Sequence, residues 1–157
     1  MSAEPLLTRE PFDGDVARPL LEALDAELDV RYPFPFDPPP PHDPADYVPP
    51  RGVFLVARLD GAAVGCGAVR PGPAPGTGEV KRMYVTPEVR GRRIAERVLA
   101  GLVDAATGLG YRRLVLETGT AQPEAIRLYE RSGWRPTAAF GHYAESPLSR
   151  CFELDLA

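Results

Sequence analysis

The sequence predicts an α/β protein, with a mixed β-sheet (α+β) flanked by helices. Short apolar runs of strand length alternate with segments of helical periodicity. A hairpin signal lies in the middle of the chain, and further strand-like runs lie near its end. Alternating strands and helices favour parallel pairing, whereas a hairpin and closing strands favour antiparallel pairing. A mixed sheet covered by helices satisfies both patterns.

The composition is that of one globular domain, which we expect to cover residues 1–157. The chain is 44% hydrophobic and 25% charged, which is an ordinary balance for a domain that buries a core. No run approaches eighteen apolar residues, and the first residues do not resemble a signal peptide. We therefore expect a cytoplasmic protein without a membrane partner. Cys66 and Cys151 lack metal-ligand spacing, so buried thiols are expected, and no metal site.

The charge is unevenly spread along the chain. A net charge of −4 argues against general binding of nucleic acid. Residues 1–50 are strongly acidic, whereas residues 79–97 carry twice as many basic as acidic side chains. The acidic part is either a surface that meets a cationic substrate or a solvated helix face, and the sequence leaves both open.

The first fifty residues predict a strand, a helix and a loop. Residues 6–9 form a short strand, and Asp13 or Asp15 can cap the helix that follows and ends near Val30. The helix has an apolar stripe made of Val16, Leu20, Leu24 and Leu28. Residues 31–50 are rich in proline, which lacks the backbone donor that helices and central strands need. Its aromatic residues, Tyr32, Phe34 and Phe36, either form a pocket wall or pack on the surface.

The middle of the chain predicts a hairpin and a third strand. Residues 53–58 and 62–69 are strand-like runs around Asp60-Gly61, and Asp-Gly is a strong hairpin signal. Residues 72–78 are a loop rich in Gly and Pro, and the strand 79–85 follows.

The last part predicts two helices and three strands. A long helix carries Ile94, Val98, Leu102 and Ala106 on one face and ends near Gly108 or Gly110. Residues 113–118 are a buried strand, and a short helix follows from about residue 122. Residues 137–140 and 150–156 are predicted strands, joined by a loop that contains His142 and Tyr143.

The stretch 79–97 predicts a binding site for an anion. It is a strand that runs into the N-terminus of the long helix, where Arg90, Arg92, Arg93 and Arg97 gather. The positive end of the helix dipole disfavours cations, so four arginines at that end suggest that an anion binds there.

Two motifs resemble those of one family, the GNAT superfamily of acyl-CoA-dependent N-acetyltransferases. Arg90-Gly91-Arg92-Arg93-Ile94-Ala95 resembles the acyl-CoA-binding turn Gln/Arg-x-x-Gly-x-Gly/Ala, with Arg93 in the place of a glycine. Residues 125–134 are similar to the signature Ala-x-x-Leu-Tyr-x-x-x-Gly-Phe. Gln122 stands where a family asparagine often precedes that signature. The resemblance covers about residues 50–156 and implies a GNAT-like sheet.

The resemblance implies that acetyl-CoA is the acyl donor. Backbone N–H groups from residues 90–95 would bind its phosphates, and the main chain of Met83 and Val85 would bind its pantetheine arm. Side chains of Arg90, Arg92 and Arg93 could add bonds to phosphate. The residues expected to bind the cofactor are Met83, Tyr84, Val85, Arg90, Gly91, Arg92, Arg93, Ile94, Ala95 and Gln122.

Catalytic roles follow from the resemblance as well. Tyr129 would be the general acid beside the CoA sulfur, and the Met83 N–H would stabilise the oxyanion. Glu79 would be the general base, unless it is a solvated residue at a strand end. Strict alternation predicts that Glu79, Lys81, Met83 and Val85 share one side of the strand, and that Val80, Arg82 and Tyr84 share the other. Glu117 and His142 are secondary candidates for the base.

The leading functional hypothesis is an N-acetyltransferase that acts on a primary amine of a small molecule by direct attack. A protein or peptide amine is the nearest variant. A CoA-binding sensor without turnover is the alternative from another class, supported by the altered turn at Arg93 and by the uncertain base at Glu79. A dinucleotide-binding enzyme is disfavoured, because no Gly-x-Gly-x-x-Gly follows a first strand. The family resemblance suggests a homodimer.

Overall fold

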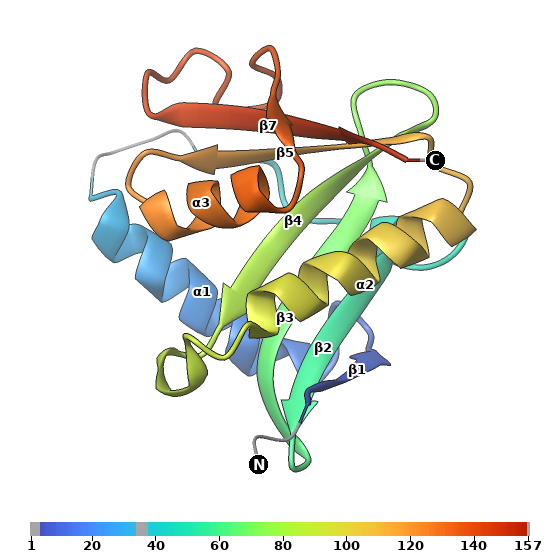
Figure 1. Ribbon diagram of the computed structural model, residues 1–157, viewed down its shortest axis with the longest axis vertical. Helices are drawn as coiled ribbons and strands as arrows, with labels where there is room; N and C mark the ends of the chain where they lie inside the picture. The colour runs from blue at the N-terminus through green and yellow to red at the C-terminus, as the bar shows by residue number, and fades with distance from the viewer. Residues whose placement is uncertain (1–3, 34–37, 157) are drawn as a thin grey trace.

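The centre of the protein is one seven-stranded mixed sheet, shown in Figure 1. The computed structural model describes residues 4–33 and 38–156. The strands are β1 (Leu6–Arg9), β2 (Val53–Leu59), β3 (Ala62–Pro71), β4 (Thr77–Val85), β5 (Arg113–Gly119), β6 (Arg135–Pro136) and β7 (Ser149–Asp155). Their order in the sheet is β1-β2-β3-β4-β5-β7-β6, in which only β4 and β5 pair in parallel. The predicted fold class is confirmed.

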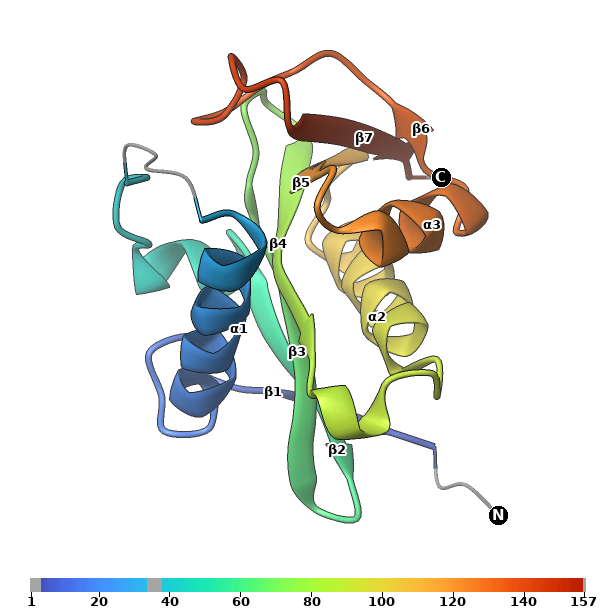
Figure 2. The same cartoon turned by 90° about the vertical axis from the view of Figure 1, so that its left-hand side faces the viewer.

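Helices cover both faces of the sheet (Figure 2). Helix α1 (Ala17–Arg31) lies on one face, and α2 (Ile94–Gly108) and α3 (Pro123–Arg131) lie on the other. Two short 3-10 turns, η1 (Pro44–Tyr47) and η2 (Pro87–Val89), lie in the connections before β2 and before α2. The bounds of all three α-helices agree closely with the prediction.

The predicted cap of α1 is wrong. The helix begins after Val16, and no side chain caps it. Asp15 pairs instead with Arg18 at 2.9 Å, and the Arg18 N–H donates to the Gly14 carbonyl. The carboxylate is therefore engaged by a side chain one turn ahead.

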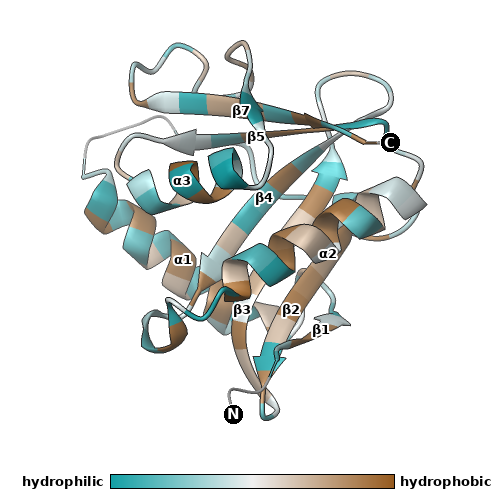
Figure 3. Ribbon diagram, in the orientation of Figure 1, coloured by the Kyte–Doolittle hydropathy of each residue, from teal (hydrophilic) through white to brown (hydrophobic). Residues whose placement is uncertain are grey.

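Each helical layer has its own hydrophobic core. On the α2 face, the predicted stripe of Ile94, Val98, Leu102 and Ala106 is almost completely buried against the sheet. Figure 3 shows hydrophobic residues along β2 and β3, where α2 crosses them. On the α1 face, Ala17, Leu20 and Leu24 pack with residues of β2, β3 and β4. Burial of these stripes holds both layers to the sheet.

Strand β4 contains a β-bulge that the sequence did not predict. Lys81 pairs with Ala68 and Tyr84 pairs with Cys66, so two residues of β4 face one residue of β3 between these pairs. Arg82 lies at this point with a φ of 62°, in the left-handed region. An extra residue in one strand shifts the alternation of its side chains by one position.

Because of the bulge, the predicted assignment of the β4 side chains to the two faces of the sheet is wrong. Val80 packs in the core under α2, and so does Met83 beyond the bulge. Tyr84 belongs to the core under α1, and the Arg82 guanidinium bonds the α1 carboxylate of Asp25 at 2.8 Å. Glu79 alternates with Val80, so it faces α1 and does not share a side with Met83.

The neighbouring strands β4 and β5 are paired over only part of their length. Parallel pairing of β4 with β5 covers only residues 77–80 and 113–116. Beyond these residues β4 continues beside β3 as far as Val85, and β5 continues beside β7 as far as Gly119. Figure 1 shows the two strands diverging. Space therefore opens between them at the end where α2 begins.

The predicted strand at residues 137–140 is wrong. β6 is only Arg135–Pro136, and one further bond joins the Thr137 N–H to the Cys151 carbonyl at 3.0 Å. Pro136 has no N–H to donate, and Ala138 and Ala139 are exposed and lie outside β6. The predicted final strand is present as β7.

The other local predictions have mixed outcomes. The hairpin turn is present, with Asp60 and Gly61 both at positive φ, as a type I′ turn requires. Cys66 and Cys151 are buried free thiols, as expected. In the proline-rich loop, Tyr47 is buried and stacks on Phe12 with ring centroids 4.0 Å apart. Phe34 and Phe36 lie outside the described residues. Within the described ranges, no helix is long and apolar enough to cross a membrane.

Candidate active site

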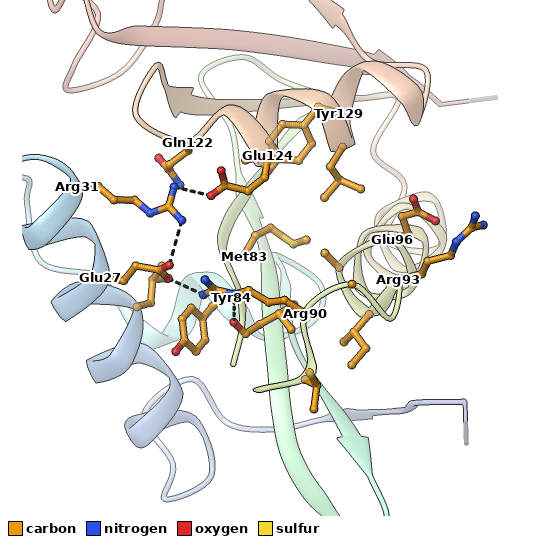
Figure 4. Close-up of a pocket in the computed structure, with 18 of the residues that line it drawn as sticks. Glu27, Arg31, Met83, Tyr84, Arg90, Arg93, Glu96, Gln122, Glu124 and Tyr129 are labelled. Atoms are coloured by element: carbon orange, nitrogen blue, oxygen red, sulfur yellow. Dashed lines mark hydrogen bonds and ion pairs between the residues drawn. The ribbon is translucent and has the colours of Figure 1, made fainter. Parts of the chain in front are cut away.

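A cavity of about 490 Å³ lies where β4 and β5 part. Its walls come from α1, the end of β4, the turn before α2, and α3, as Figure 4 shows. Most residues predicted to form the site line it, namely Met83, Tyr84, Val85, Arg90, Gly91, Arg93, Ile94, Ala95, Gln122 and Tyr129. Glu79 and Arg92 are not among the described residues that line it. The fold thus brings ten of the twelve predicted residues to one cavity.

The start of α2 is suited to an anion. The first N–H groups of a helix have no partner inside the helix, and no side chain caps α2. Gly91, in the turn before the helix, has a φ of 86°, which glycine adopts without a steric penalty. The uncapped N–H groups and the positive end of the dipole both face the cavity end that Arg93, Ile94 and Ala95 line.

Arg93 occupies the N-cap position of α2 in the left-handed conformation, with a φ of 61°. It therefore adopts the backbone conformation that glycine favours, even though its Cβ makes this conformation costly. We expect Arg93→Gly to raise the free energy of unfolding by about 0.5–1 kcal/mol, because the relief of this cost exceeds the extra entropy of glycine in the unfolded chain.

Chemical denaturation of the purified variant measures this change. Arg93→Ala is the matched control, because it removes the side chain and keeps the Cβ, so it should show no such gain. If both variants were equally stabilised, the guanidinium and not the backbone would be the cause.

The Arg90 guanidinium is engaged by the protein. Its Nε donates to the Val85 carbonyl at 3.0 Å, and its Nη2 donates to the Glu27 carboxylate at 2.9 Å. It also lies 5.7 Å from the centre of the Tyr84 ring. These contacts tie the turn to the end of β4 and to α1. In Figure 4, the Arg93 side chain lies beside Glu96 and points away from Arg90 and Glu27.

Tyr129 is a rigid, buried side chain on α3. Its ring packs near Trp134 and Phe152, with centroids 5.9 Å and 6.1 Å away, and only 5% of the residue is exposed. Burial raises the pKa of its hydroxyl above the ordinary value. The group therefore remains a neutral proton donor at neutral pH. Tyr129 lines the same cavity as the start of α2.

Helix α1 contributes charged residues that the sequence analysis did not select. Glu27 bonds Arg90, and it also accepts from Arg31 at 3.2 Å. Arg31 pairs in turn with Glu124 of α3 and donates to the Ala121 carbonyl at 2.9 Å. The spacing of Glu27 and Arg31 is that of an ordinary helix surface pair. Only the fold shows that both reach the cavity.

The hydroxyl of Tyr32 also reaches this cavity wall. It donates to the Gln122 side-chain oxygen at 3.0 Å. A side chain at Gly119 would overlap the Tyr32 ring, so glycine at this position leaves room for it. Tyr32 is one of the three aromatic residues considered as a pocket wall. Its hydroxyl holds the side chain of Gln122, a predicted cofactor-binding residue.

Two carboxylates lie on the α1 side of the sheet, near the point where β4 and β5 separate. Glu79 lies opposite Val115, within the paired part of β4 and β5, and binds the Lys81 ammonium at 3.3 Å. Glu117 is the first residue of β5 beyond the last pair. Its carboxylate accepts from the Ser149 hydroxyl at 2.7 Å, and burial raises its pKa although that bond and Lys81 oppose the shift. Glu117, like Glu79, is not among the described residues that line the cavity, and it stays a candidate for the base.

Comparisons with known proteins agree with the fold. Residues 21–134 match the family model described as the acetyltransferase (GNAT) family. An IAA acetyltransferase from Azospirillum brasilense is 39% identical over 96% of this chain and 97% of its own length. A Klebsiella pneumoniae structure, provisionally assigned as an acyl-CoA N-acyltransferase, has a TM-score of 0.83 at 33% identity, with 98% of both chains covered.

A third comparison is with a protein solved with its ligand. A GNAT family acetyltransferase from Elizabethkingia anophelis, with acetyl-CoA bound, has a TM-score of 0.68 at 17% identity and covers 98% of this chain and 99% of its own. The fold and these matches define an enzyme of the acyltransferase class. The chain belongs to the GNAT family of acetyltransferases.

Proposed function

We propose that the protein transfers the acetyl group of acetyl-CoA to a primary amine of a small molecule, by direct attack while both substrates are bound. The observation that carries this proposal is that the uncapped start of α2 and the buried Tyr129 side chain line one cavity. The first group suits a pyrophosphate, and the second suits a departing thiolate. The acetyl-CoA found in the Elizabethkingia relative supports the choice of donor.

The residues of the cavity fit acetyl-CoA, which supplies an acetyl group activated as a thioester. Backbone N–H groups from Gly91 to Ala95 would hold the pyrophosphate, since no side chain occupies them as a cap. Main-chain groups of Met83 and Val85, on the edge of β4 that β5 has left, would hold the pantetheine arm. The Gln122 amide, held by Tyr32, would add a donor from α3.

The proposed proton transfers use three groups of the protein. Glu117 takes a proton from the acceptor's ammonium, and the freed amine forms the new C–N bond. The Met83 N–H, beside the bulge, donates to the oxygen that gains negative charge. As the C–S bond breaks, the Tyr129 hydroxyl gives its proton to the sulfur, and the tyrosinate oxygen takes up the second proton that the attacking nitrogen loses as the amide forms. Glu79 remains the alternative base, but its carboxylate is engaged by Lys81.

Two other hypotheses compete with this proposal. A sensor without turnover rests on the altered turn at Arg93 and on the uncertain base at Glu79. Arg93 adopts the backbone conformation of the missing glycine, which favours an intact turn and so favours the enzyme. A protein or peptide amine is the nearest variant of the acceptor, and the acceptor panel below includes short peptides.

A panel of acceptors tests the function. Amines, amino acids, polyamines, aminoglycosides and short peptides are incubated with acetyl-CoA, and the release of CoA thiol is measured. We expect release that depends on an amine, and mass spectrometry should detect one added acetyl group on the acceptor. Reactions without an amine control for hydrolysis. Tight binding of acetyl-CoA without turnover over the whole panel would instead support the sensor.

A further inference from the structure

A chain of ion pairs crosses the gap between the parted strands. It runs from Arg90, in the turn before α2, to Glu27 and Arg31 of α1 and on to Glu124 of α3. We call these four residues the ion-pair bridge. Figure 4 shows the four side chains in an arc on the α1 side, joined one to the next by dashed lines. The bridge thus joins the elements that flank the cavity on its two sides.

The bridge stands where the sheet provides no link of its own. Hydrogen bonding between β4 and β5 ends at Val80 and Leu116. Beyond this point the turn before α2 continues from β4, and α3 continues from β5. Arg31 strengthens the connection by donating to the Ala121 carbonyl in the loop before α3. Helix α1 therefore sets how far apart the two halves of the site stand.

We propose that Glu27 is a positioning residue of the acetyl-CoA site, acting through Arg90 on the turn that binds the phosphates. This inference rests on the proposed function for the identity of the ligand. Arg90 binds the Val85 carbonyl through Nε and Glu27 through Nη2. With both bonds made, the guanidinium fixes the path of the chain from β4 into α2. Without Glu27, the guanidinium has only one of its two anchors.

The surroundings of Glu27 favour a strong interaction. Its side chain is 24% exposed, as is that of Arg31, so both are shielded from much of the solvent. Burial acts to raise the pKa of Glu27, but the bonds to Arg90 and Arg31 outweigh it and leave the pKa below its ordinary value. A carboxylate that accepts from two guanidinium groups makes charge-assisted hydrogen bonds, which are strong and directional. Glu27 is thus suited to fixing a geometry.

Glu27→Gln tests the inference, with Asp25→Asn as the matched control. Asp25 lies on the same helix and pairs with Arg82 at 2.8 Å, but neither residue lines the cavity. We expect Glu27→Gln to raise the KM for acetyl-CoA and the Kd for CoA about 5- to 10-fold, with kcat within about twofold of wild type. The Tm should fall slightly at neutral pH, because a carboxylate whose pKa is lowered on folding contributes stability there. Asp25→Asn should leave all four values unchanged.

A double-mutant cycle tests the route through Arg90. If Glu27 acts through Arg90, the double variant with Arg90→Gln should bind CoA no more weakly than Arg90→Gln alone. Additive losses would overturn this route. An unchanged KM in Glu27→Gln, or an equal change in Asp25→Asn, would overturn the inference itself.

Hydrogen exchange of the free protein separates this inference from the proposed function. Amides of residues 89–95 should exchange faster in Glu27→Gln than in wild type or Asp25→Asn, whether or not any acceptor is found. If the wild type bound no CoA but this difference were present, the proposed function would fail and the positioning role of Glu27 would stand. If CoA bound and the difference were absent, the positioning role would fail alone.

Discussion

Replacing Tyr129 with phenylalanine is expected to lower kcat about 100-fold and to leave the KM for acetyl-CoA within about twofold. The substitution removes the hydroxyl proton that the sulfur needs as it leaves, and it keeps the ring that packs near Trp134 and Phe152. Steady-state measurement of thiol release at saturating acceptor gives both constants. The ratio between the two effects separates a role in chemistry from a role in binding.

Tyr111→Phe is a control for the loss of a tyrosine hydroxyl. That hydroxyl donates to the Arg51 carbonyl, and Tyr111 does not line the cavity, so kcat should be unchanged. The raised pKa of Tyr129 adds a second expectation. Its hydroxyl stays protonated beyond the ordinary tyrosine value of 10.0, so the wild type should not lose activity through this group below that pH. A wild-type rate in Tyr129→Phe across the pH range would show that another group is the acid.

Glu117→Gln is expected to lower kcat about 100-fold at neutral pH, because the amide cannot accept the ammonium proton. In the wild type, kcat/KM should rise with pH as Glu117 loses its proton, with a midpoint above the ordinary glutamate value of 4.5, because burial raises its pKa. The Ser149 hydroxyl, Lys81 and His142 act to lower that pKa, and Glu79 acts to raise it. The variant should lose this rise in rate.

Glu79→Gln is the companion variant for the choice of base. If Glu79 is the base, the loss of rate and of its pH dependence should follow Glu79→Gln instead. Unfolding cannot explain a loss in Glu117→Gln. A raised pKa in the folded state favours folding below the unfolded pKa, and this contribution is lost as pH rises through the folded pKa. At neutral pH the charged group no longer gives this contribution, so Glu117→Gln should not lower the Tm on this account.

The predictable parts of the fold were those with local signals. The stripe from Ile94 to Ala106 marks α2 because each residue needs only its own helix to define the buried face. The Asp60-Gly61 turn is equally local, since both residues adopt positive φ. The position of Arg93 was predicted, but its conformation was not, because the glycine that usually announces a left-handed residue is absent.

The unpredicted parts depend on residues far apart in the chain. The bulge at Arg82 is defined by the register between β3 and β4, and no pattern within β4 alone reveals it. Glu117 lies just beyond the last residue of β5 that pairs with β4, and only the fold shows where that pairing ends. Glu27 looked like any helix carboxylate, and only the approach of Arg90 distinguishes it. The prediction of a strand at residues 137–140 was wrong. A proline without a backbone N–H precedes this segment, and Ala138 and Ala139 within it are exposed.

The bulge in β4 divides the strand into two stretches, and the alternation of side chains between the two faces of the sheet is reversed from one stretch to the other. Glu79 and Lys81, before it, lie on the α1 side, whereas Met83 and Val85, after it, line the cavity and pack under α2. Neighbours in the sequence thus belong to different layers of the protein. One inserted residue therefore places Glu79 and Met83, which strict alternation would put on the same side, in different layers of the protein.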